Sequence, residues 1–210
     1  MSYRLAIFDF DGTLADSLPW FQRVIGVIAQ EFGLREVGPE ERQVLRGCQP
    51  REALARLGVP LWQVPRIARR LRQLKALEAH RLPLFPGVAE LLRDLAQRGV
   101  PRAIVSSDAE ANIRSTLGRE HAALIDHYAC GAGLFGKPPL LRKVLRHYRL
   151  HPAEALYVGD ELRDAEAARA VGIAFGAVTW GYTPPDAMRA QAPARLFTTV
   201  AEIAPAIRCA

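Results

Sequence analysis

Cysteine is scarce in this sequence, and its three cysteines are scattered. Cys48, Cys130 and Cys209 are odd in number and far apart among 210 residues, so we expect no disulfide framework and a reducing, cytoplasmic compartment. Long apolar runs are also lacking, because no stretch approaches the roughly 20 residues needed to span a bilayer. Residues 1–4 lead directly into an apolar segment without a signal-peptide pattern. We therefore expect no membrane partner.

The remaining composition is that of an ordinary globular protein, with 50% hydrophobic and 24% charged residues. The net charge of +6 raises the question of a nucleic-acid partner. However, the arginines are spread along amphipathic segments such as residues 66–72, and no nucleic-acid-binding motif is present. The same charge suits a small anionic substrate. We expect no nucleic-acid partner, and the sequence does not indicate an oligomeric state.

One apolar segment near the start of the chain ends in two carboxylates. Leu5 to Phe8 has the composition of a buried strand, and Asp9 and Asp11 follow it. Residues two apart on an extended chain point the same way, so these carboxylates repel unless a cation or a proton lies between them. Gly12 then lets the backbone leave the strand direction. Aspartate is also common in turns and helix caps, and a turn or cap role is the alternative for this pair. Segments later in the sequence decide between the two interpretations.

The rest of the sequence divides into a helical insertion and an alternating region. Residues 16–83 show helical periodicity interrupted by glycine and proline, with no strand pattern. Beyond them, strands predicted at 103–105, 125–129, 155–158, 174–180 and near residue 196 alternate with helices. This alternation predicts an α/β fold, a doubly wound (Rossmann-like) parallel sheet. We expect a core of residues 1–15 and 84–210, with a small α-helical cap domain, residues 16–83, inserted after the first strand.

Two polar positions follow apolar or glycine-containing segments of the predicted core. Ser106 ends a strand, where a hydroxyl and backbone amides can bind a phosphate oxygen. A helix-capping role is an equal alternative for Ser106, and it is the stronger interpretation for Ser107 and Asp108. Lys137 opens a helix, where its charge opposes the helix dipole. A nearby anion would explain this position, and a chance surface placement is the alternative.

A dense acidic group follows the strand at 155–158. Asp160 ends that strand as Asp9 ends the first, and Asp164 comes one helical turn later, with Glu161 between them. Favourable charge at a helix N-terminus would explain one or two of these residues. Together with the first pair they resemble a site for a hard cation such as Mg²⁺, which takes oxygen ligands.

These motifs, in this order, resemble those of the haloacid dehalogenase-like hydrolase superfamily. The resemblance spans the chain, and residues 84–88 and 178–181 are further similar to the phosphoglycolate phosphatase-like branch. The motif residues are Asp9, Asp11, Thr13, Asp16, Ser17, Ser106, Lys137, Gly159, Asp160 and Asp164. The resemblance implies an enzyme, a phosphoric monoester hydrolase that uses Mg²⁺ and a small phosphorylated metabolite.

The resemblance also implies a role for each motif residue. Asp9 would be the nucleophile that forms an aspartyl-phosphate, and Asp11 the general acid and then base. Ser106 and Lys137 would bind the transferring phosphoryl oxygens, helped by Thr13 and Ser107. The Mg²⁺ ligands would be the Asp9 carboxylate, the Asp11 carbonyl and Asp160, while Asp164 supports the metal or orients Lys137.

Substrate choice is expected to lie in the cap. Arg46 and Arg51 stand in a segment that resembles the part of the cap facing the active site in related enzymes, and either could meet an anionic substrate group; both facing solvent is the alternative. The physiological substrate is left open between phosphoglycolate, a sugar phosphate and similar esters. The alternatives in function are a sugar-phosphate mutase and a non-catalytic binding protein. A phosphonate hydrolase would need a cap lysine, and the only one is Lys75, in a segment without a motif.

Overall fold

A single parallel sheet organises the molecule. The structure, a computed structural model, describes residues 3–133 and 136–207. Six strands lie in the order β3-β2-β1-β4-β5-β6, and every neighbouring pair is parallel. Their bounds are β1 Leu5–Phe8, β2 Arg102–Val105, β3 His127–Ala129, β4 Ala155–Gly159, β5 Ala174–Val178 and β6 Arg195–Phe197. The predicted doubly wound α/β fold is confirmed.

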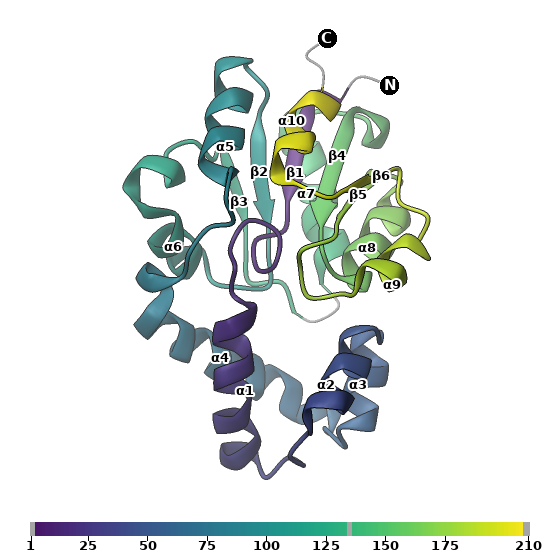
Figure 1. The fold of residues 1–210 in the computed structure, drawn as a ribbon. Coiled ribbons are helices and arrows are strands. Elements are labelled where there is room, and N and C mark those ends of the chain that lie inside the picture. Colours follow the sequence, from purple (N-terminus) through teal and green to yellow (C-terminus); the bar gives the residue numbers. More distant parts are fainter. Residues whose placement is uncertain (1–2, 134–135, 208–210) are drawn as a thin grey trace.

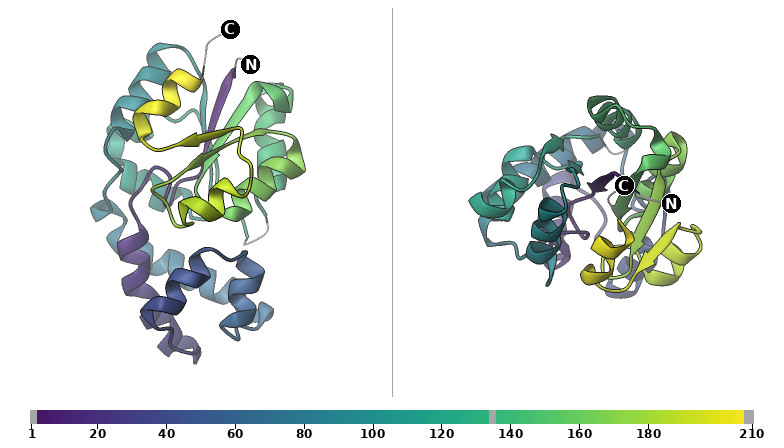
Figure 2. Two further views of the ribbon diagram at one scale, coloured as in Figure 1. Left: turned by 45° about the vertical axis from the view of Figure 1, so that its right-hand side comes forward. Right: turned by 90° about the horizontal axis from the view of Figure 1, so that it is seen from above.

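Helices cover both faces of the sheet because apolar side chains alternate along the strands. In β1, Ala6 and Phe8 pack into one cluster and Leu5 and Ile7 into the other. On the first face lie α5 (Val88–Gln97), α6 (Glu110–Ala122) and α10 (Ile203–Ala206). On the second lie α7 (Lys137–Tyr148), α8 (Leu162–Val171) and α9 (Pro185–Arg189). Figure 2 shows the two layers from the side and from above.

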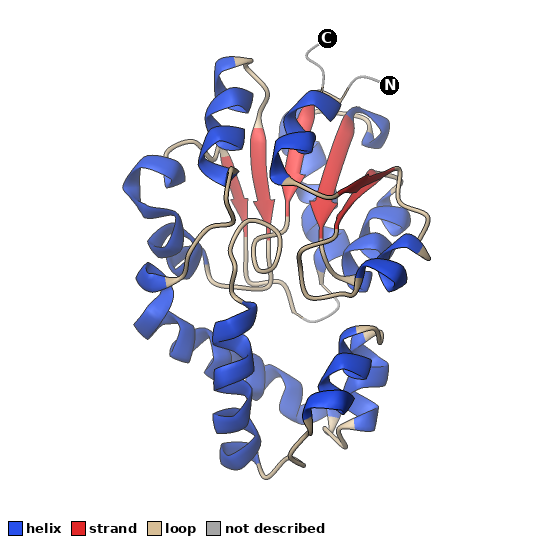
Figure 3. Cartoon of the chain, in the orientation of Figure 1, coloured by secondary structure: helices blue, strands red, loops and turns tan. Residues whose placement is uncertain are grey.

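A separate group of helices forms the cap at the carboxyl ends of the strands (Figures 1 and 3). Its helices are α1 (Leu18–Phe32), α2 (Pro39–Arg46), α3 (Pro50–Arg56) and α4 (Val64–Glu78). Helices α1 and α4 share an apolar cluster built around Trp20, Val24 and Ile28. Among the described side chains of α2 and α3, none is buried. The cap therefore has a packed arm, α1 with α4, and a more exposed arm, α2 with α3.

The chain enters and leaves the cap at one place. Ala15 forms an antiparallel bridge with Leu84. Two backbone hydrogen bonds flank it, from Asp16 to the carbonyl of Pro83 (2.9 Å) and from Phe85 to the carbonyl of Leu14 (2.9 Å). The two linkers thus run side by side between core and cap. Within the described residues, no helix combines the length and apolar character needed to cross a membrane.

The sheet order also predicts where a ligand binds. Strands β2 and β3 lie on one side of β1, whereas β4, β5 and β6 lie on the other. Ligands of such sheets bind beyond the carboxyl ends of the strands where the order reverses, which here is at β1 and β4. The cap faces this edge (Figure 1).

Candidate active site

Asp9 lies immediately beyond the end of β1 and is buried. Side chains two residues apart on a strand point to the same face. The Asp9 side chain therefore lies, like that of Ile7, on the face of the sheet covered by α7 and α8. There its Oδ2 lies 2.9 Å from the Nζ of Lys137, with both side chains almost fully buried. The end of β1 therefore places the Asp9 carboxylate beside a buried cation, the Lys137 ammonium.

Lys137 is held by a second carboxylate, that of Asp164 in the first turn of α8. Its Nζ lies 2.5 Å from Asp164 Oδ1, which also accepts a hydrogen bond from the Tyr157 hydroxyl (2.8 Å). Asp164 Oδ2 accepts from the backbone N–H of Glu161 (3.0 Å). Burial alone would raise the pKa of Asp164, but Lys137 and Arg163 outweigh it and hold that pKa below its usual value. Burial likewise opposes the charge of Lys137, yet Asp164 and Asp9 raise its pKa.

Asp160, at the end of β4, is enclosed on every side. The Thr13 hydroxyl donates to its Oδ1 (2.7 Å), and the Tyr182 N–H donates to its Oδ2 (2.8 Å). Gly12 has a φ of +77°, and a Cβ there would lie 2.2 Å from the carboxylate; one on Gly181 would lie 2.1 Å from the Asp160 Cβ. Only glycine fits at these two positions, so the loop after β1 and the loop after β5 close directly on this carboxylate.

The three carboxylates of Asp9, Asp160 and Asp164 offer oxygen atoms within 4.8 Å of one another. Burial raises the pKa of Asp9 to about 7, against the opposing charge of Lys137. Burial, with Asp9 and Glu161 nearby, also raises the pKa of Asp160 well above its usual value. Three buried carboxylates here share one buried lysine, Lys137, so the cluster carries excess negative charge when all three are ionised. An all-oxygen donor set with excess negative charge fits a hard divalent cation such as Mg²⁺.

Asp11 reaches a different cation from that of Asp9. The chain turns after β1, and Asp11 Oδ1 pairs with the Nζ of Lys75, a residue of the cap helix α4. Lys75 also lies 2.7 Å from Asp108 Oδ2. Burial alone would raise the pKa of Asp11, but Lys75 outweighs it and lowers that pKa. Asp9 and Asp11 therefore have different partners, because Asp9 pairs with Lys137 of the core and Asp11 pairs with Lys75 of the cap.

Ser106 and Ser107 follow β2 at the same edge. The buried Ser106 hydroxyl accepts a hydrogen bond from the Asp108 N–H (3.1 Å), which leaves its own hydrogen available for donation. The Ser107 carbonyl accepts from Arg72 of the cap (3.1 Å), and its hydroxyl lies 3.5 Å from Arg163. Arg163 pairs in turn with Glu161.

The two cap arginines expected at the substrate lie on the exposed arm. Arg46 donates to the backbone carbonyls of Tyr182 (2.7 Å) and Gly181 (3.1 Å), so it bridges cap and core. Arg51 is exposed on α3. The substrate-binding roles expected of Arg46, Arg51, Thr13 and Ser107 remain predictions, as do the catalytic and metal-binding roles of the core motifs.

Sequence reasoning missed Lys75, Asp108 and Arg163 at this edge. Lys75 had one available signal, since it is the only lysine in an otherwise arginine-rich helix. Asp108 follows the strand-ending serines and was interpreted only as a helix cap. Arg163 lies between two acidic residues of the last motif, which drew attention to its neighbours instead.

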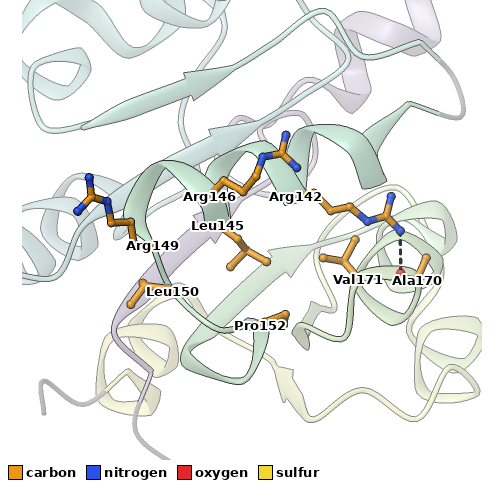
Figure 4. Close-up of a pocket in the computed structure, with 8 residues that line it drawn as sticks. All are labelled: Arg142, Leu145, Arg146, Arg149, Leu150, Pro152, Ala170 and Val171. Atoms are coloured by element: carbon orange, nitrogen blue, oxygen red, sulfur yellow. Dashed lines mark hydrogen bonds between the residues drawn. The ribbon is translucent and has the colours of Figure 1, made fainter.

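A surface hollow of about 550 Å³ lies away from this edge, between the ends of α7 and α8. Three arginines stand at its rim, Arg142, Arg146 and Arg149, over an apolar floor that includes Leu145 and Val171. Figure 4 shows the Arg149 side chain pointing away from that of Arg142, which donates to the Ala170 carbonyl (3.0 Å). The guanidinium groups do not converge on one position that an anion could occupy. We therefore expect the catalytic chemistry at the carboxyl edge of the sheet and not in this hollow.

Known proteins resemble this chain over nearly its whole length. The family model of the haloacid dehalogenase-like hydrolases matches residues 6–178. A phosphoglycolate phosphatase of Synechococcus elongatus is 35% identical over 202 residues, covering 96% of this chain and 95% of that protein. An N-acetylmuramic acid 6-phosphate phosphatase of Pseudomonas putida is 30% identical, covering 89% and 87%.

Solved structures share the fold at lower identity. A haloacid dehalogenase-like family protein of Streptococcus pneumoniae has a TM-score of 0.79 at 21% identity, covering 97% of this chain and 98% of its own. CbbY of Rhodobacter sphaeroides, in complex with phosphate, has a TM-score of 0.69 at 22% identity and covers 96% of each chain. The chain therefore belongs to the haloacid dehalogenase-like hydrolases, in their phosphoglycolate phosphatase-like branch, and is an enzyme of the phosphoric monoester hydrolase class.

Proposed function

We propose that this enzyme is a Mg²⁺-dependent phosphatase that hydrolyses a small phosphomonoester through an aspartyl-phosphate on Asp9. The observation that carries the proposal is the position of Asp9 at the end of β1, between the Lys137 ammonium and the Asp160 carboxylate. A carboxylate beside a fixed cation, at the edge of the sheet where ligands bind, is suited to attack a phosphorus atom whose oxygens that cation holds.

In the first half of the reaction, an Asp9 carboxylate oxygen forms a bond to phosphorus as the bond from phosphorus to the ester oxygen breaks. The Asp11 carboxyl gives its proton to that oxygen, and the alcohol leaves. Lys137 and the Ser106 hydroxyl bind the non-bridging oxygens, where charge changes in the transition state. Asp164 pairs with the lysine and is itself held by the Tyr157 hydroxyl, so the ammonium needs little reorganisation.

In the second half, the oxygen of a water molecule forms a bond to phosphorus and the bond to Asp9 breaks. The proton of the water passes to the Asp11 carboxylate, and inorganic phosphate leaves. This step uses the base form of Asp11. The neighbouring Lys75 lowers the pKa of that carboxyl, which favours the base form and opposes the acid form used in the first half. After it, Asp9 and Asp11 have returned to their starting states.

Asp9 and Asp160 are the side chains proposed to hold Mg²⁺, together with the backbone carbonyl of Asp11. When bound, the ion would screen the repulsion between the Asp9 carboxylate and an anionic phosphoryl group. Asp164 pairs with the Lys137 ammonium through an oxygen that the Tyr157 hydroxyl also holds in place, so we assign it to positioning Lys137. The Thr13 hydroxyl and the Tyr182 N–H fix the Asp160 carboxylate in the position proposed for binding the ion.

The substrate is proposed to be a small phosphorylated metabolite. Phosphoglycolate and N-acetylmuramic acid 6-phosphate are the substrates in the names of relatives at 35% and 30% identity, and both belong in the first panel. A sugar-phosphate mutase remains the alternative that shares this core. A phosphonate hydrolase with a Schiff-base lysine is disfavoured, because Lys75 lies between two carboxylates that stabilise its charged form, whereas an attacking amine must be neutral.

The test is phosphate release from a panel of phosphomonoesters, with and without Mg²⁺, by wild type and Asp9→Asn. We expect release by the wild type to need Mg²⁺ and the substitution to reduce it by roughly three orders of magnitude or more. The amide preserves the shape of the side chain but removes the nucleophilic charge. The ranking across the panel would identify the substrate class.

Asp186→Asn is the matched control, since Asp186 is a highly exposed carboxylate on α9 paired only with Arg189 among the described residues. It should leave the rate unchanged. A folded wild type that releases no phosphate from any ester, or Asp9→Asn that retains wild-type activity, would reject the proposal. Interconversion of sugar phosphates without release would instead favour the mutase.

A further inference from the structure

Two arginines from different domains reach Ser107, a half-buried residue at the edge of the active site. Arg72 belongs to the cap helix α4 and donates to the Ser107 carbonyl (3.1 Å). Arg163 belongs to the first turn of α8, and its Nη2 lies 3.5 Å from the Ser107 hydroxyl. Ser107 directly follows Ser106, which is proposed to bind a phosphoryl oxygen. Both guanidinium groups therefore flank the phosphoryl position, and the proposed phosphoryl-transfer steps use neither of them.

Arg163 is a fixed cation of the core. Its Nη2 donates to Glu161 Oε1 (2.9 Å), and the other oxygen of that carboxylate lies against its Nε. Only 15% of the Arg163 side chain and 19% of that of Glu161 are exposed. A planar guanidinium group that is held along one edge directs its remaining N–H groups in a set direction. Among the described residues, its Nη1 has no hydrogen-bond partner, so Arg163 retains donors for another anion.

Arg72 is a half-buried cation without a carboxylate partner among the described residues. Its backbone carbonyl accepts a hydrogen bond from the Asn112 side chain (3.0 Å), which fixes this turn of α4 on the core. An arginine side chain offers five N–H donors, and the bond to the Ser107 carbonyl uses one of them. The charge and the other donors of Arg72 are therefore left for a ligand.

The charges in contact around Ser107 leave one positive unit. Arg72 and Arg163 contribute two positive charges, and Glu161 contributes one negative charge. A charge that is partly removed from water is costly unless an opposite charge lies beside it. One remaining unit suits a monoanion, and the planar guanidinium fork matches the geometry of a carboxylate.

We propose that Arg72, Arg163 and Ser107 form a subsite for a carboxylate group of the substrate, so that the enzyme prefers phosphomonoesters that also carry a carboxylate. The inference rests on the proposed phosphatase function. Arg163 is the half of the subsite that the core provides, and Arg72 is the half that the cap provides. Both arginines bind and orient the substrate, and neither forms a bond to phosphorus.

The first test compares a carboxylate-bearing ester with its amide, which has nearly the same shape and no charge. Phosphoglycolate and phosphoglycolamide are the first pair, and any acid of the panel that the enzyme hydrolyses faster is paired with its amide in the same way. We expect the kcat/KM of the wild type to favour the acid roughly 100-fold, because the amide loses two charge-assisted contacts. Equal values would reject the subsite and leave the phosphatase standing, whereas no phosphate release from any ester would reject the phosphatase itself.

The second test replaces each arginine by methionine, which keeps an unbranched side chain and removes the charge. Arg163→Met and Arg72→Met should each raise the KM for the acid roughly 10- to 30-fold and change its kcat little. The KM for the amide should change less than about threefold. A loss shared equally by acid and amide would show that the arginines act on the phosphoryl group or on the fold, and would overturn the proposal.

Matched variants separate recognition from packing. Arg69→Met is the control, since Arg69 is an exposed arginine one turn before Arg72 on the same helix, and it should retain the preference of the wild type. Arg163→Met leaves Glu161 without its cation, which can destabilise the fold. Glu161→Gln with Arg163→Met removes both charges and should show the same loss of preference as Arg163→Met. A double variant that prefers the acid as the wild type does would contradict the proposal.

Binding to Asp9→Asn gives a readout that does not depend on turnover. Calorimetric titration of this variant should show the acid binding at least about tenfold more tightly than its amide. Adding Arg163→Met should abolish that difference by weakening the acid alone. Equal affinity of Asp9→Asn for the acid and the amide would overturn the carboxylate subsite.

Discussion

Two buried lysines stand at this site, one in the core and one in the cap, and each lies between two aspartates. Lys137 joins Asp9 to Asp164, and Lys75 joins Asp11 to Asp108. In each case one carboxylate belongs to the first motif and the other is anchored by hydrogen bonds behind it. The difference is the element that carries the cation. Helix α7 packs on the sheet, whereas α4 belongs to a domain joined through two adjacent linkers.

This difference separates a permanent contact from a conditional one. Lys137 and Asp9 keep their geometry as long as the core is folded, because both rest on the same sheet. Lys75 and Asp11 keep theirs only while the cap is docked. The nucleophile is thus prepared by the fold itself, while the proposed acid and base is prepared by an arrangement of two domains.

The largest effect on activity is expected at the permanent contact between Lys137 and Asp9. Lys137→Met should lower kcat/KM by roughly 100- to 1,000-fold for every ester, whatever its leaving group, because the charge that stabilises the phosphoryl oxygens is lost. Steady-state kinetics with two esters measure this: an alkyl phosphate, whose alkoxide must be protonated as it leaves, and a nitrophenyl phosphate, whose phenolate leaves without a proton. Lys143→Met, an exposed position on the same helix, is the control and should be neutral. A loss confined to the alkyl ester would break the comparison, since it would show that Lys137 acts on protonation of the leaving group and not on the phosphoryl oxygens.

An intermediate effect is expected from loosening the packed arm of the cap. Ile28 is fully buried in the cluster shared by α1 and α4, and Ile28→Ala should destabilise that arm by about 2–5 kcal/mol. Hydrogen exchange should show the loss of protection in α1 and α4 and little change in β1 and β4. Ile28→Val, which removes one methyl group, should cost about 0.5–1.5 kcal/mol. Equal loss of protection in the sheet would show that cap and core unfold as one unit.

The smallest effect is expected on the exposed arm. Arg46→Ala removes two hydrogen bonds to the loop beside Asp160 and should raise KM roughly three- to tenfold with kcat nearly constant. Arg51→Ala, on the neighbouring helix, tests the predicted contact with the substrate in the same assay. A fall in kcat that depends on the leaving group would instead show that the exposed arm acts on proton transfer by Asp11.

The sequence predicted the core well because its signals are local. Short apolar strands that end in aspartate or serine identify β1, β2 and β4, and helical intervals between them require parallel pairing. The weaker strands were placed too generously: the segment 125–129 is a strand only at His127–Ala129, and the segment 174–180 only at Ala174–Val178. The backbone N–H groups of Asp126 and Thr179 still bond to the neighbouring strands, at the carbonyls of Arg102 (2.9 Å) and Phe197 (3.1 Å), but the regular strand ladder does not include these two residues.

The cap side of the site could not be predicted in the same way. Whether Lys75 faces solvent or Asp11 depends on how α4 docks on the core. The residues next to Lys75 in the sequence do not indicate how that helix docks. Asp108 was overlooked for a related reason, since its partner is 33 residues away in another domain. The pairing of Asp9 with Lys137 joins residues even further apart, but the parallel sheet already brings the ends of β1 and α7 to one edge.

The side-by-side linkers at Ala15 and Leu84 make the cap a replaceable module. Because the chain leaves and re-enters the core at one antiparallel bridge, the core needs only a tight connection there to remain continuous. Closing a long loop between adjacent ends costs little additional entropy as the loop lengthens. Natural or engineered exchange of residues 16–83 for another domain, or for a short turn, would therefore change access to Asp9 while leaving the sheet intact. The sheet can consequently keep its stability while the segment that covers Asp9 changes.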